Sequence, residues 1–197
     1  LAVDTGVAAA AARPYMIEAE ACTTAEELAL ALVRHWPTGV KDIARGFVLN
    51  WVRQELGDQN LERFLLDLAD DASATPDARL LRFALRVVPR MPAVWRGVSL
   101  GDDTIGAHVV RTLRHEDDGA FLAELYRADA LGQFGPTHPE RARLAALRER
   151  WRARVEAYRK VAAQLTEAET TARKALMRET GVADYDSLMF GRSAGAL

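Results

Sequence analysis

The chain contains a single cysteine, Cys22, and no long apolar run among its 197 residues. One cysteine excludes an internal disulfide and is typical of a reducing compartment, so we expect a cytoplasmic location. A membrane-spanning helix needs about 20 consecutive apolar residues. The Ala-rich run 8–12 is much shorter and has no basic flank before it, so no membrane partner is predicted. Because the chain begins at Leu1 rather than Met, we expect a fragment of a longer protein or a processed chain.

Catalytic and cofactor-binding motifs are also missing. The histidines are His35, His108, His115 and His138, and no two of them have the i, i+4 spacing of a helical metal site. The sequence contains no GxSxG, GxxxxGK[ST] or GxGxxG motif. The acidic run 115–118 offers metal ligands, but a helix end followed by acidic caps accounts for the same residues. The sequence therefore predicts no enzyme activity, no cofactor and no metal site.

The composition is that of a folded helical protein. Hydrophobic residues make up 49% of the chain and charged residues 27%, which is enough for a substantial core. The formal net charge of −2 gives no overall attraction to nucleic acid or to anionic lipid. We find no credible strand pair and no repeat of fixed period, so we predict an all-α protein. Its parts are an arm or linker over 1–22, a compact helical bundle over 23–132, and a long helix or helical hairpin with a short C-terminal segment over 137–197.

Local signals define the helices of this bundle. Residues 24–27, Thr-Ala-Glu-Glu, form a capping box at a helix start. Apolar residues at i, i+3, i+4, i+7 and i+11 predict a second helix over 40–51. The segment 77–88 is apolar on most sides and is therefore the predicted central helix. It ends before Pro89, and we expect Trp95 to pack back against it.

The Ala-rich arm contains few apolar anchors. Only Tyr15, Met16 and Ile17 follow one another after Pro14, so we expect the arm to dock through these three residues.

The longest predicted element follows Pro139. No proline or glycine occurs between it and Gly181, and a single helix of about 40 residues would be roughly 60 Å long. A narrow apolar stripe, typical of a coiled-coil seam, runs along it. Residues 166–169, Thr-Glu-Ala-Glu, match a second capping box, so a break into an antiparallel hairpin is the alternative. The stripe consists of Leu144, Leu147, Trp151, Val155, Tyr158, Ala162 and Leu165.

Arginines lie on both sides of this stripe. Residues 141–160 contain eight basic side chains and only two acids, Glu149 and Glu156. Arginines beside a seam cover it with their aliphatic stems and pair with acids on a partner helix. A nucleic-acid surface is the alternative, since phosphate contacts also need clustered basic residues. Because the positive charge is divided between the two sides of the apolar stripe, we favour a protein partner or a homo-oligomer. The predicted partner-binding residues are Leu144, Leu147, Trp151, Val155, Tyr158, Arg148, Arg152 and Arg159.

Part of the predicted bundle has a pattern of tryptophan, glycine, arginine and proline residues. It consists of Trp36, Gly39, Val40, Arg45, Gly46, Trp51, Leu80, Leu81, Arg82 and Pro89, and then Val94 to Gly97. With these residues, the chain over about 26–100 is similar to helical accessory modules of large bacterial proteins, which lie beside protein-kinase-like or Hsp70-like chaperone domains. The resemblance implies a non-enzymatic interaction or regulatory role in a signalling or chaperone-type system, and it carries no catalytic residues.

Overall fold

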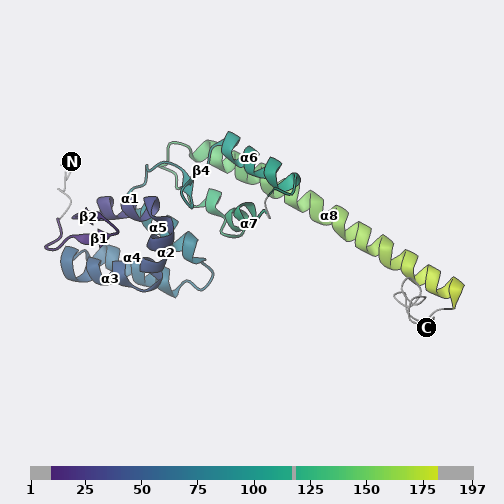
Figure 1. Cartoon of the computed structure of the whole chain (residues 1–197), viewed down its shortest axis with the longest axis horizontal. Coiled ribbons are helices and arrows are strands. Elements are labelled where there is room, and N and C mark those ends of the chain that lie inside the picture. The colour runs from purple at the N-terminus through teal and green to yellow at the C-terminus, as the bar shows by residue number, and fades with distance from the viewer. Residues whose placement is uncertain (1–9, 117–118, 182–197) are drawn as a thin grey trace, which may run out of the picture. The chain divides into compact units, whose positions relative to one another are not determined.

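The computed structural model describes residues 10–116 and 119–181, and most of them are helical (Figure 1). This confirms the predicted compact helical part followed by a long helix. Contacts divide the chain into an N-terminal unit, Leu1–Arg148, and a C-terminal unit, Glu149–Leu197. In order, the elements are β1 (Tyr15–Ile17), β2 (Glu20–Cys22), α1 (Ala25–Arg34), α2 (Trp36–Ala44), α3 (Phe47–Trp51), the π-helical turn η1 (Val52–Leu56), α4 (Gln59–Asp70), α5 (Pro76–Val87), β3 (Val94–Trp95), β4 (Val98–Ser99), α6 (Asp102–Leu113), α7 (Ala120–Arg127), the 3-10 turn η2 (Ala130–Gly132) and α8 (Arg141–Thr180).

Helix α5 forms the centre of the N-terminal unit, as its apolar sequence predicts. It packs against α1 and α2, and the side chains of Leu80, Leu81 and Phe83 are fully buried. The helix begins where the sequence indicates, because the Thr75 hydroxyl accepts a hydrogen bond from the Ala78 backbone N–H at 3.2 Å. The buried face and the start of this helix are therefore both encoded locally.

The predicted helix over 40–51 is wrong, because the chain breaks at Gly46. This residue has a φ of 76°, a left-handed conformation that ends α2 and favours glycine. The break rotates the following helix, so Val48 and Trp51 are buried while Phe47 is 49% exposed. The continuous apolar pattern across the glycine therefore predicted the burial of Trp51 correctly but assigned Phe47 to the buried face in place of Val48.

Two short hairpins correct the prediction that the chain forms no strand pair. In the first, Tyr15 pairs with Cys22 and Ile17 with Glu20, and Ile17 and Cys22 are buried. Met16 points the other way and is 59% exposed, as alternation along a strand requires. The arm therefore docks through Tyr15, whose hydroxyl donates to Asp42 Oδ2 at 2.8 Å, and through Ile17.

The second hairpin joins β3 to β4. Its turn residues Arg96 and Gly97 both have positive φ, as in a type I′ turn. The turn brings Trp95 back onto α2, where its ring meets that of Trp36 edge to face at a centroid distance of 5.5 Å. Trp95 is fully buried, so the hairpin closes the core.

Helix α8 is one continuous helix over Arg141–Thr180, so the hairpin alternative is wrong for these residues. Its first eight residues belong to the N-terminal unit and the rest to the C-terminal unit. Every described side chain of the C-terminal unit is exposed or half-buried. This unit therefore has a long helical surface and, within its described residues, no buried core.

Candidate functional site

The first residue of the predicted seam, Leu144, lies in the core of the N-terminal unit. Its side chain is fully buried, and Leu147, one turn further on, is half-buried. A partner cannot reach a side chain that the protein's own fold covers. Leu144 is therefore not part of the surface available for binding, which corrects the predicted seam at its N-terminal end.

Arg148 also has a structural role within the N-terminal unit. Its guanidinium donates two hydrogen bonds to Asp129, from Nε to Oδ1 and from Nη2 to Oδ2, both at 2.6 Å. Such bidentate pairs are the geometrically specific form of an ion pair. Gly132 allows the approach, because a Cβ atom there would lie 2.6 Å from Asp129 Oδ2 and 2.8 Å from Arg148 Nε. Arg148 therefore ties α8 to η2, and a role in partner binding would require breaking this pair.

The exposed part of the stripe lies on the C-terminal unit. Tyr158 and Leu165 are 74% and 66% exposed, and Val161, which the sequence analysis did not select, is 53% exposed. Their spacing of three and four residues places them on one side of the helix. We call these three residues the exposed seam. Trp151 and Val155 are half-buried, and Arg152 and Arg159 are exposed.

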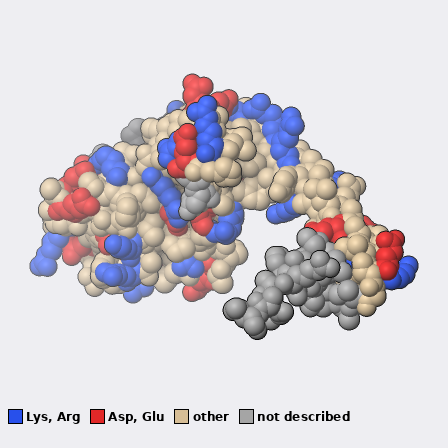
Figure 2. All heavy atoms as spheres, turned by 45° about the vertical axis from the view of Figure 1, so that its right-hand side comes forward, with Lys and Arg blue, Asp and Glu red and all other residues tan. Residues whose placement is uncertain are grey.

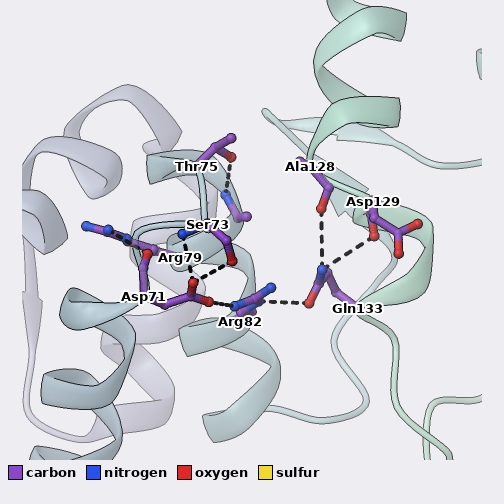
Figure 3. Close-up of polar contacts among 9 residues, drawn as sticks. Asp71, Ser73, Thr75, Arg79, Arg82, Ala128, Asp129 and Gln133 are labelled. Carbon is purple, nitrogen blue, oxygen red and sulfur yellow. Dashed lines mark hydrogen bonds and ion pairs between the residues drawn. The ribbon is translucent and has the colours of Figure 1, made fainter.

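A surface cavity of about 330 Å³ lies on the N-terminal unit, next to a polar network (Figure 3). Arg82 lines it and donates from Nη1 to Asp71 Oδ2 at 2.6 Å and from Nε to Gln133 Oε1 at 2.9 Å. Gln133 Nε2 in turn donates to the backbone oxygens of Ala128 and Asp129, at 3.3 and 3.5 Å. The network therefore links α5 to the end of η2, so the contacts of Arg82 are accounted for by a structural role. The lining residues are Phe64, Arg82, Leu85, Arg86, Pro89, Gln133, Gly135 and Thr137.

This network makes stability depend on pH. The Ser73 hydroxyl, the Arg82 guanidinium and the Ser73 backbone N–H lower the pKa of Asp71 from 3.8 to about 2. A lowered folded-state pKa stabilises the protein above the unfolded value, and the contribution is lost as the pH falls from about 4 towards 2. Urea unfolding should therefore show Asp71→Asn to be less stable than the wild type near pH 6, with the difference vanishing near pH 2. Asp70→Asn, at the neighbouring exposed carboxylate, is the control. A stability difference between Asp71→Asn and the wild type that does not change with pH would contradict the role of Asp71 in this pH dependence.

Metal-binding clusters and membrane-spanning helices are both absent from the described residues. Within 10–116 and 119–181, no three His, Cys, Asp or Glu side chains gather closely enough to hold a metal ion. Part of the acidic run 115–118 lies outside the described residues. No helix in the described part of the chain combines the length and apolar character that crossing a membrane requires. Acidic and basic side chains are intermingled over the helical bundle on the face that Figure 2 shows, so no large basic patch appears there.

Comparisons with protein-family models, with curated proteins and with solved structures found no match for this chain. The exposed surface of the molecule is therefore what indicates its function.

Proposed function

We propose that this chain is a non-enzymatic protein-interaction or regulatory module that binds a protein partner through the exposed seam of α8. One observation carries the proposal: three large apolar side chains lie more than half exposed on a single side of one helix. Contiguous exposed apolar side chains are typical of interaction sites, because covering them removes apolar surface from water at about 25 cal/mol per Å².

The surroundings of the seam indicate what kind of surface would cover it. Arg154 and Arg159 are exposed near these side chains. Arg154 continues the line of the seam one turn before Tyr158, and Arg159 lies about 100° around the helix from Tyr158. Their aliphatic stems extend the apolar surface, while their charged heads favour carboxylates on the partner. The best match is therefore a helix with an apolar stripe and with carboxylates near the level of these arginines. The proposed setting, a bacterial signalling or chaperone-type system, depends on the resemblance of 26–100 alone.

A photo-crosslinking amino acid at position 161 tests the proposal in cells that produce the protein. We expect irradiation to form covalent adducts with protein from this position. The same amino acid at position 156, which lies about 160° around the helix from Tyr158, is the matched control and should give little adduct. Equal yields from both positions, or adduct from neither, would refute a specific protein site on the seam.

Removing the apolar side chains should remove the interaction without unfolding the protein. Tyr158→Ser combined with Leu165→Ser changes two side chains that are mostly exposed. We expect the adduct at position 161 to fall at least tenfold, because each lost apolar anchor costs on the order of 1–2 kcal/mol of binding free energy. Thermal unfolding of the N-terminal unit should be unchanged. Adduct yields equal to those of the parent protein would show that the seam is not the contact surface.

Nucleic-acid binding is the alternative, and one observation favours it. Residues 150–160 contain five basic side chains and one acid. Arg148, which the alternative also needs, is already bound to Asp129. Phosphate binding would weaken steeply with salt, whereas an apolar seam would not. A gel shift with double-stranded DNA and with RNA across a salt series separates the two functions. Nucleic-acid binding would be supported by a shift that weakens with salt and that persists in the variant carrying both Tyr158→Ser and Leu165→Ser.

A further inference from the structure

We propose that the partner on the exposed seam is a second copy of this chain, packed antiparallel. This inference depends on the proposed function, since it names the occupant of the same surface. Three observations carry it: the spacing of the seam residues, the size of the side chains that an antiparallel alignment brings together, and the distribution of charge along α8.

The spacing is that of a coiled coil. Tyr158 and Leu165 of the exposed seam, together with Val155 and Ala162, are separated by three, four and three residues, the heptad pattern of positions that face a partner helix, and Val161 lies at the edge of this face. Two further residues, Glu169 and Ala172, continue the same pattern. A helix of these dimensions therefore has one face suited to a second helix over at least 155–172.

One antiparallel alignment places the aliphatic side chains of this face opposite alanines. When Ala162 of one copy lies opposite Leu165 of the other, Val155 lies opposite Ala172 and Tyr158 opposite Glu169. Large and small side chains that alternate across an interface interdigitate without voids. The Tyr158 hydroxyl can then donate a hydrogen bond to the Glu169 carboxylate of the second copy. In a parallel pair, by contrast, Tyr158 would meet Tyr158 and Glu169 would meet Glu169.

Charge also favours the antiparallel arrangement. Residues 150–160 contain five basic side chains and one acid, whereas 167–177, the segment that faces them in the antiparallel alignment, contains two acids and two basic residues, Glu167, Glu169, Arg173 and Lys174. A parallel pair would set each basic segment beside itself, with Arg154 near Arg159 of the second copy. In the antiparallel alignment, Glu169 lies at the level of Arg159 of the second copy. Since opposite charges near a seam decide helix orientation, the copies should pair antiparallel.

Distances between spin labels test the orientation directly. Lys160 and Lys174 lie on the side of the helix opposite the seam, so labels there leave the interface intact. In the proposed alignment the two labels at position 160 are displaced along the axis by about 10 Å, and those at 174 by about 31 Å. A parallel pair gives no axial displacement at either position. The labels are attached to cysteines at these positions in the full chain, with the buried Cys22 replaced by alanine.

A charge exchange provides a second readout. Glu169→Arg places a positive charge beside Arg159 of the second copy, and we expect dimer affinity to fall about 2- to 30-fold at low salt. Adding Arg159→Glu in the same chain should restore most of the lost dimer affinity. In a parallel pair, positions 159 and 169 lie about 15 Å apart along the axis, so the second substitution would restore nothing.

The outcomes separate this inference from the proposed function. Sedimentation of the full chain across a concentration series should show a monomer–dimer equilibrium, and photo-crosslinked adducts from position 161 should contain two copies of this chain. A chain that stays monomeric, while position 161 crosslinks to a different protein, would overturn the inference and leave the proposed function intact. Equal label distances at 160 and 174 would overturn the antiparallel arrangement.

Discussion

Leu144→Ala is expected to lower the free energy of unfolding of the N-terminal unit by about 2–5 kcal/mol. The side chain is fully buried, so its truncation loses apolar transfer free energy and leaves a cavity in the core. Nearby ion pairs hold this part of α8 in place: Arg148 pairs with Asp129, and Arg143 donates to Asp102 Oδ1 at 2.7 Å. The helix therefore cannot shift freely to fill the space. Urea unfolding followed by tryptophan fluorescence measures the loss.

Leu165→Ala is the matched control, since it makes the same chemical change on the same helix. Leu165 is 66% exposed, so its truncation should change the stability of the N-terminal unit by less than about 0.5 kcal/mol. We expect it instead to reduce crosslinking from position 161. Leu144→Ala should weaken folding and leave the seam chemically unchanged. Equal losses of stability from the two variants would contradict the division of the stripe into a core part and an exposed part.

Leu144 and Leu165 also mark the limit of what the sequence could predict about the site. Both belong to one stripe with the spacing of a helix face, so periodicity alone treats them alike. Their burial differs because, among the described residues, α8 has a buried side chain only in its first turns, and what covers a helix face depends on the tertiary fold. Likewise, Arg148 resembles Arg152 and Arg159 in sequence, and Asp129, its partner, lies 19 residues away.

The elements that were predicted correctly have strong local signals. The capping box at Thr24 forms, with the Glu27 N–H donating to the Thr24 hydroxyl at 3.1 Å. Helix α5 is recognisable because its apolar residues, eight of twelve with Pro76, extend over most of its sides, and α8 because neither proline nor glycine occurs in it. Each of these features is decided within a few neighbouring residues, so tertiary contacts did not have to be known.

The elements that were missed depend on contacts or on single backbone conformations. Strands of two and three residues are too short to show alternation, and the β3–β4 turn places Arg96, a non-glycine residue, at a φ of 52°. The β1–β2 hairpin is stabilised by distant partners such as Asp42 and Trp51. Gly46 breaks a regular apolar pattern through its backbone alone. None of these features leaves a periodic signal in the sequence.

Trp95→Ala is expected to lower the free energy of unfolding by about 3–5 kcal/mol, the range for truncating a large aromatic side chain in a core. The indole is fully buried against Trp36, whose own Nε1 donates to Asp77 Oδ1 at 2.7 Å. Arg96, the next residue, donates to the same carboxylate from Nε and Nη2. Losing the indole would therefore empty the core beneath the hairpin and loosen the carboxylate that joins α2, α5 and the β3–β4 turn.

Trp95→Phe separates packing from polarity at the same position. Among the described residues the buried Trp95 Nε1 has no hydrogen-bond partner, and an unsatisfied buried donor costs about 1–3 kcal/mol. Phenylalanine keeps an aromatic ring against Trp36 and removes this donor. The desolvation cost that is thereby avoided offsets much of the stability lost through the cavity that the smaller ring leaves. We expect Trp95→Phe to lose less than half of the stability that Trp95→Ala loses in urea unfolding. A loss as large as that of alanine would mean that Nε1 is hydrogen-bonded in the folded protein, with ordered water as the partner to look for.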